Sequence, residues 1–183
     1  SETIRLRRHL HQHPELSFEE YHTADFIEQT LKGYGIPSLR LGKTGVIAVL
    51  EGQAEGERIL ALRADIDALP IQEISDPNYA SRNPNIMHAC GHDVHTASLL
   101  TTARILSENA ASWGGKIKII FQPAEEKFPG GASILIEEGV LKNPDPDIIL
   151  AQHVFPELEA GKLGFKEGPF MPSADEIYIT VHG

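Results

Sequence analysis

Apolar residues recur with helical spacing in four stretches of the chain. In the second of them, Ser17 and Glu20 have the spacing of a capping box, and Gly33 and Gly35 supply a stop. The pattern predicts four helices: the opening residues up to His13-Pro14, the residues from Ser17 to Gly33, residues 93–109, and Ala132–Glu138.

Segments between these stretches have the composition of strands. Residues 45–52 and 58–67 flank a charged, turn-rich link, which predicts a hairpin. Residues 116–123 and 147–154 are rich in Ile and Val, so we expect buried strands there. Two further short strands are expected, at 163–170 and 175–183. Strands that alternate with helices predict an α/β fold, a sheet with helices on its faces.

Composition narrows the class of protein. The chain has 183 residues, of which 41% are hydrophobic and 23% charged, which is typical of a globular protein. A net charge of −10 excludes the basic surface of a nucleic-acid-binding protein. No apolar run approaches the roughly 20 residues that span a membrane. The single Cys forms no internal disulfide, which fits a cytoplasmic protein. The chain lacks an initial Met, so a preceding targeting segment stays open.

Polar side chains gather where the expected strands end. Asp65 and Asp67 end one strand, Glu125-Glu126 follows another, and His153 ends a third, while MHACGHDVH (87–95) precedes a helix. Because the carboxyl ends of strands line the ligand crevice of open α/β sheets, these groups are expected to meet.

Each polar group alone also has an ordinary explanation. Asp65, Asp67 and Glu125-Glu126 are explained as surface charge, Cys90 as a small buried side chain, and His153 as a core histidine. Together, a thiolate, imidazoles and carboxylates suit zinc, manganese, cobalt or nickel, and a helix N-terminus beside the thiol favours the thiolate. Adjacent glutamates allow one to bind metal while the other acts as a base. The residues alone leave a metal hydrolase and a protein without a metal site about equally supported.

The motifs add a resemblance to a known family. RADIDALPI, MHACGHDVHTA, FQPAEE followed by GGA, and QHV at 152–154 resemble those of the metal-dependent amidohydrolases of the aminoacylase/carboxypeptidase superfamily. The similarity is greatest to hippurate hydrolases and to hydrolases of auxin–amino-acid conjugates. The opening HLHQHPELSFEE is similar to that branch as well, so the resemblance covers essentially the whole chain.

The resemblance implies a mixed sheet between helices, of the zinc-peptidase type, and two divalent metal ions per complete subunit. Zinc or manganese is expected, with cobalt or nickel as further options. By position, Cys90 would bridge the two metals, His92 and His153 would complete one metal site, and Glu126 would bind the other metal. Glu125 would be the general base. Asp67 would orient the metal centre, and Asp65 would support it.

The implied activity is hydrolysis of the amide bond of an N-acyl amino acid, or of a related peptide or deacetylase substrate. Residues 1–171 would be the N-terminal part of the catalytic domain and 172–183 the start of a lid through which subunits dimerise. The last ligand histidine and a lid histidine would lie beyond Gly183, so these 183 residues are expected to be a truncated piece with little activity alone. His182 is given no catalytic role.

Two other functions stay open from the residues. One is a non-catalytic metal-binding or interaction module on the same scaffold, and the other is a mononuclear peptidase or deacetylase. Of the remaining aromatic residues, His88 and His95 are candidates for supporting groups around the ligands, Trp113 is expected to pack at a helix end, and His9, His11, His13 and His22 are expected on the surface.

Overall fold

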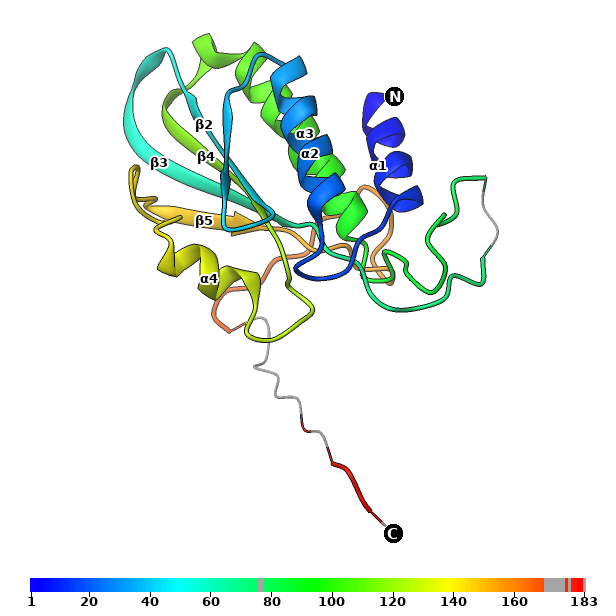
Figure 1. Cartoon of the computed structure of the whole chain (residues 1–183). Helices are drawn as coiled ribbons and strands as arrows, with labels where there is room; N and C mark the ends of the chain where they lie inside the picture. Colours follow the sequence, from blue (N-terminus) through cyan, green and yellow to red (C-terminus); the bar gives the residue numbers. More distant parts are fainter. Residues whose placement is uncertain (76–77, 170–176, 178, 183) are drawn as a thin grey trace.

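The computed structural model describes residues 1–75, 78–169, 177 and 179–182 (Figure 1). In chain order the elements are α1 (Glu2–Gln12), α2 (Tyr21–Gly33), β1 (Ser38–Leu41), β2 (Gly45–Glu51), β3 (Ala54–Asp65), α3 (His92–Glu108), the short 3-10 helix η1 (Ala110–Ser112), β4 (Gly114–Gln122), α4 (Gly131–Glu137) and β5 (Ile148–Ala151).

The five strands form one mixed sheet with the order β1-β2-β4-β3-β5. β2 is antiparallel to β1 and to β4, whereas β3 is parallel to both β4 and β5. The expected hairpin of β2 and β3 is therefore wrong, because β4 lies between them. β4 is buried from Ile117 to Gln122, as suits the central strand of a sheet covered on both faces.

Helices cover both faces of the sheet, as expected for this α/β class (Figure 1). On one face α1, α2 and α3 pack against alternate strand residues such as Val46, Ile119 and Phe121. On the other face α4, through Leu135, contacts the intervening residues, among them Ile120. The core is thus two apolar layers separated by the sheet, with the larger layer under the three N-terminal helices.

The predicted helices are confirmed, but the expected start of the second one is wrong. α2 begins at Tyr21, and neither Ser17 nor Glu20 caps it with its side chain. The Ser17 hydroxyl donates to Asp67 instead, at 2.7 Å, and the Glu20 carboxylate accepts bonds from Thr44 and Ala124. The capping-box pattern therefore has another use in this fold.

Several strand predictions need correction. β5 is present, but its side chains from Ile148 to Leu150 are about half exposed rather than buried. Residues 163–169 contain no strand, and β1 was not expected. Part of the predicted strand 175–183, where the second domain was expected to begin, lies outside the described residues, and residues 177 and 179–182 form no strand. Within the described part of the chain, no helix has both the length and the apolar character needed to cross a membrane.

Trp113 packs at a helix end as expected, and its indole N–H donates to the Leu106 carbonyl at 3.0 Å. His22 is exposed, but His11 is buried, so the expected surface position of His11 is wrong. His11 bonds Asp93 at 2.8 Å and Glu73 at 3.1 Å. Arg7 bonds the same oxygen of Asp93 at 2.7 Å, so this network ties α1 to the first turn of α3.

Candidate metal centre

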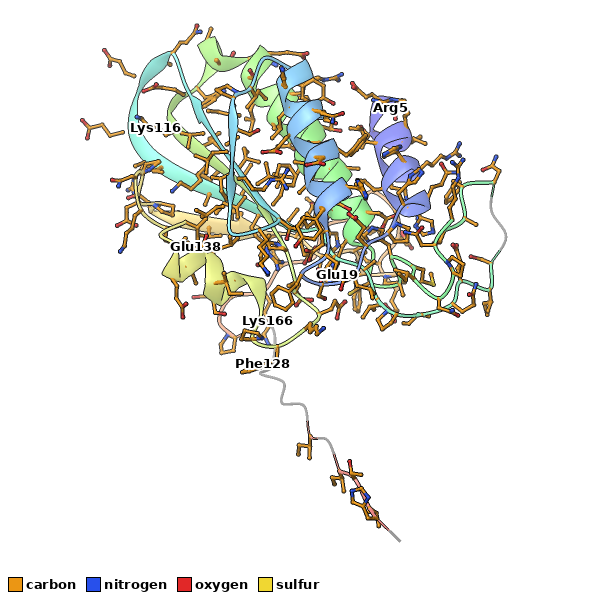
Figure 2. The ribbon with its side chains drawn as sticks, in the orientation of Figure 1. Arg5, Glu19, Lys116, Phe128, Glu138 and Lys166 are labelled. Atoms are coloured by element: carbon orange, nitrogen blue, oxygen red, sulfur yellow. The ribbon has the colours of Figure 1, made fainter. Side chains whose placement is uncertain are left out.

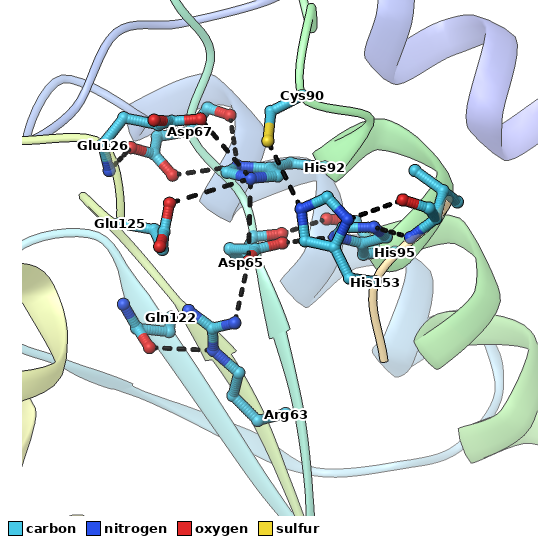
Figure 3. Close-up of polar contacts among 12 residues, drawn as sticks. Arg63, Asp65, Asp67, Cys90, His92, His95, Gln122, Glu125, Glu126 and His153 are labelled. Atoms are coloured by element: carbon cyan, nitrogen blue, oxygen red, sulfur yellow. Dashed lines mark hydrogen bonds and ion pairs between the residues drawn. The ribbon is translucent and has the colours of Figure 1, made fainter. Parts of the chain in front are cut away.

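The polar residues predicted from the sequence meet at the carboxyl ends of the three parallel strands (Figure 3). β3 ends at Asp65, β4 at Gln122 and β5 at Ala151. The segments that follow these ends, together with the start of α3, contribute Asp67, Glu125, Glu126, His153, Cys90 and His92. The expected convergence of groups far apart in the sequence is therefore present.

His92 lies at the centre and is 1% exposed. It is the first residue of α3 and follows Gly91, whose φ of +86° favours glycine. Its Nδ1 lies 3.0 Å from the Asp67 carbonyl oxygen and 3.2 Å from Asp67 Oδ1. Because a carbonyl oxygen only accepts, Nδ1 carries the proton, and Nε2 offers a lone pair on the opposite side of the ring.

The Nε2 atom of His92 faces three carboxylates. It lies 3.6 Å from Asp65 Oδ2, 3.7 Å from Glu126 Oε1 and 4.0 Å from Glu125 Oε2. Burial lowers the pKa of His92, but Asp67, Asp65 and Glu126 outweigh it and raise the pKa overall. The carboxylates that favour a proton on this ring would also favour a divalent cation at the same place.

Cys90 and His153 form the other side of the site. The Cys90 sulfur lies 3.3 Å from Nε2 of His153, whose Nδ1 is 2.7 Å from the Val154 carbonyl oxygen and therefore donates to it. As at His92, the bond fixes the tautomer and leaves Nε2 available toward the sulfur. Both atoms thus point into the space in front of His92 (Figure 3).

The expectation that the α3 N-terminus favours the Cys90 thiolate is wrong for the metal-free protein. Burial, together with the nearby carboxylates of Glu126, Glu125 and Asp65, raises the pKa of the thiol to about 12. Negative charge around the sulfur therefore outweighs the helix end. A thiolate would form here only with positive charge beside it.

The adjacent glutamates lie on the turn that follows β4. The backbone N–H of Glu126 donates to Asp67 Oδ2 at 3.0 Å, which ties the turn to the acid that holds His92. The Glu125 side chain is 43% exposed, and its closest polar contact within the described residues is the 4.0 Å approach to Nε2 of His92. Burial, followed by the charges of Glu126 and Asp65, raises the pKa of Glu125, as a group that must accept and release a proton requires.

Asp65 lies beneath these groups in an anchoring network. Its Oδ2 accepts a bond from Arg63 at 2.8 Å, and its Oδ1 lies 2.6 Å from Nδ1 of His95. Nε2 of His95 accepts the backbone N–H of Val154 at 3.0 Å, so the His95 proton is on Nδ1 and is donated to Asp65. His95 therefore links β3 to the residue after His153.

The residues fit a pair of divalent cations. Three groups of side chains bring ligand atoms within 4.8 Å of one another: Cys90 with His92 and His153, Asp65 with His92 and His95, and His92 with Glu125 and Glu126. Nε2 of His92 and Oε1 of Glu126 are buried without a hydrogen-bond partner among the described residues. Such atoms are costly to bury unless something binds them, and a cation would do so.

Sequence reasoning missed several supporting residues. These are Ser17, Glu20 and Arg63, which carried no metal-site pattern. His95, which was named as a candidate supporting group, does bond Asp65. His88 is buried, and neither ring nitrogen has a partner in the described part of the chain. Burial lowers the pKa of His88 to about 4 and keeps the ring neutral.

Comparisons with known proteins agree with this site. A family model described as Peptidase family M20/M25/M40 matches residues 61–180. The chain is 48% identical over 184 residues to an N-acyl-L-amino acid amidohydrolase of Geobacillus stearothermophilus, covering 100% of the chain and 49% of that protein. It is 41% identical over 180 residues to a hippurate hydrolase of Campylobacter jejuni, covering 98% and 46%.

A solved structure is similar over most of the chain. The Bacillus subtilis YXEP protein, described as a dinuclear metal binding peptidase from the M20 family, superposes with a TM-score of 0.86 at 46% identity, covering 91% of this chain and 46% of that one. The chain thus spans about half the length of the curated relatives it matches. The resemblance drawn from the motifs is confirmed.

Proposed function

The chain belongs to peptidase family M20/M25/M40, and on that premise we propose that it carries the metal centre of a hydrolase that cleaves the amide bond of N-acyl amino acids. One observation carries the proposal. The unpartnered His92 Nε2 and Glu126 Oε1 lie 3.7 Å apart, at the meeting point of the groups that could hold metal. The substrate class comes from the relatives, which are named for N-acyl amino acids, N-acetylcysteine and hippurate.

The proposed ligands divide between two cations. Cys90 would bridge them, His92 and His153 would complete one site, and Glu126 would bind the other. The bridging role is supported by the surroundings of the sulfur, which lies 3.3 Å from Nε2 of His153 and close enough to Glu126 for that carboxylate to raise its pKa. Asp67 would orient the centre, because it holds both Nδ1 of His92 and the N–H of Glu126.

The cations would act as Lewis acids toward the acyl carbonyl and the attacking water. Glu125 would accept the proton of that water, because its carboxylate is partly exposed, makes no short hydrogen bond with the described residues and has a raised pKa. The same carboxyl would then donate the proton to the amine nitrogen as it leaves. Asp65 would not transfer protons, because Arg63 and His95 already occupy its two oxygens.

The domain division and the lid are proposed from the family resemblance of the motifs. Residues 1–171 would be the N-terminal part of the catalytic domain, and 172–183 the start of a lid through which two subunits dimerise. A working Cys90 must stay reduced, which favours the cytoplasm. A small-molecule N-acyl amino acid is the expected partner.

The test uses a chimera in which these 183 residues replace the matching segment of the Geobacillus stearothermophilus amidohydrolase. With Zn²⁺ or Mn²⁺ the chimera should release amino acid from N-acetyl and N-benzoyl amino acids. Glu125→Gln should keep its metal, measured by elemental analysis, and lose roughly 10²–10⁴-fold in kcat. Glu137→Gln, an exposed glutamate on α4, is the matched control and should leave kcat unchanged.

Wild-type turnover in Glu125→Gln would refute the role of that residue. A folded chimera that binds metal but hydrolyses none of these substrates would favour the non-catalytic module instead. Retained fold is checked by a cooperative melting transition.

A further inference from the structure

Glu20 is a buried acid that the proposed mechanism does not use. Its side chain is 0% exposed, and it forms no ion pair with the described residues. Burial raises its pKa, against the lowering effect of the hydrogen bonds that it accepts. An acid without a cationic partner is costly to bury, so the bonds that hold it indicate what it contributes.

Both carboxylate oxygens of Glu20 hold segments remote in sequence. Oε2 accepts the Thr44 hydroxyl at 2.7 Å, next to the start of β2. Oε1 accepts the backbone N–H of Ala124 at 2.7 Å, at the end of β4. Ala124 directly precedes Glu125 and Glu126, so Glu20 holds the Pro123–Ala124 peptide unit at the start of the turn that carries both glutamates.

That peptide unit has a conformation that needs support. Ala124 has a φ of +46°, in the left-handed region that non-glycine residues seldom occupy. Its carbonyl accepts the N–H of Gly131 at 2.8 Å, and a Cβ at Gly131 would lie only 1.9 Å from the Pro123 carbonyl oxygen. The turn is therefore closed at its far end by Gly131 and at its near end by Glu20.

Ala124 itself is 0% exposed, but packing around the turn is incomplete. A cavity of about 330 Å³ lies beside it, lined by residues that include Phe18, Thr44, Pro123 and Leu135. The outer part of the same loop projects into solvent, where Phe128 is 86% exposed (Figure 2). Without the bond from Ala124 to Glu20, the backbone could relax toward a right-handed conformation, and both glutamates would change direction.

We propose that Glu20 is a positioning residue that aims Glu125 and Glu126 at the metal centre by fixing the Ala124 peptide. This inference rests on the proposed function, because it takes Glu126 as a metal ligand. It assigns a role in the site to a residue whose sequence pattern predicted only a helix cap.

The test measures Co²⁺ binding to this chain by absorption spectroscopy. Glu20→Ala should weaken the Co²⁺ affinity of the site completed by Glu126 by about 10–100-fold, as losses of supporting residues around a metal commonly do. The thiolate-to-cobalt band from Cys90 should persist, because Cys90 lies on a different segment. Glu20→Gln should restore the affinity, since its amide oxygen can still accept the Ala124 N–H.

Glu15→Ala is the matched control. Glu15 also accepts a backbone N–H and a threonine hydroxyl, both from Thr23, at 2.7 and 2.8 Å, but it does not contact the turn. It should lower the melting temperature and leave Co²⁺ affinity unchanged. Unchanged affinity in Glu20→Ala, an equal loss in Glu15→Ala, or no recovery in Glu20→Gln would overturn the inference.

If Glu20→Ala does not melt cooperatively, Glu20→Asp takes its place. The shorter side chain keeps a buried carboxylate but withdraws it from the Ala124 N–H, so the same loss of affinity is expected. Wild-type affinity in that variant would refute the positioning role. A wild-type chain that binds no Co²⁺ at all would instead contradict the metal centre, and the inference with it.

Discussion

Replacing His95 with Ala tests how the centre is held together. His95 donates to Asp65 at 2.6 Å and accepts the N–H of Val154 at 3.0 Å, and its side chain is 0% exposed. The substitution removes both bonds, leaves Arg63 as the side chain that still donates a hydrogen bond to Asp65 within the described residues, and creates a cavity. Loss of a hydrogen bond to a charged group costs about 1.5–3 kcal/mol, a large share of the roughly 5–15 kcal/mol that stabilises a typical domain.

The same substitution should release His153 from its place. With the Val154 N–H unpaired, the segment after β5 loses its link to α3, and affinity for Zn²⁺ should fall by about 10–100-fold. Urea denaturation with a chelator present gives the loss of stability without a metal contribution. Isothermal titration with Zn²⁺ gives the change in affinity.

His13→Ala is the control for the His95 measurement. His13 donates through Nδ1 to the His9 carbonyl within its own segment, at 2.8 Å, and does not touch the site. It should change Zn²⁺ affinity little. A loss of less than about 1 kcal/mol in His95→Ala, together with unaltered Zn²⁺ affinity, would refute the claim that this ring links β3 to His153.

Two pH-dependent predictions follow from the same site. Because burial and neighbouring carboxylates raise the pKa of the Cys90 thiol to about 12, metal binding must displace the thiol proton. Metal affinity should therefore strengthen as pH rises, and calorimetry in buffers of different ionisation enthalpy should detect the released proton. Cys90→Ala should bind less metal and release fewer protons. Full metal occupancy in that variant would argue against the bridge. Burial opposes ionisation of Asp65, but His95, Arg63 and His92 lower its pKa from 3.8 to about 2. Its ionised form therefore stabilises the fold above pH 3.8, and about 2 kcal/mol should be lost as pH falls from 3.8 to 2, measured by urea denaturation of the metal-free protein; Asp65→Asn should lack this dependence.

The sequence predicted the elements better than their arrangement. Helical spacing found α1 to α4 because each helix has a strongly periodic apolar face. The predicted pairing of β3 with β2 was wrong. A charged link between two apolar segments has the same sequence pattern whether the two strands are adjacent in the sheet or a third strand lies between them. Exposure of Ile148 to Leu150 was also missed, since composition does not tell which strand lies at an edge.

The candidate site was recovered through residue types with an affinity for metal. Cys90, His92, Glu126 and His153 meet as expected, because strand ends were predicted correctly even where strand order was not. The supporting residues were missed for a physical reason. Ser17 and Glu20 are placed by tertiary contacts 50 and 104 residues away along the chain, and a local pattern of capping residues gave them a different role.

The strand order sets when this centre can form during folding. β3 is synthesised before both of its neighbours in the sheet. β4 follows α3 in the chain, and β5 follows α4. Each parallel pairing closes a long loop, which is the slow kind of contact. A nascent chain can therefore present Cys90 and His92 to metal well before His153 arrives, so an early-bound ion would be held by a partial set of ligands and exchanged until β5 docks.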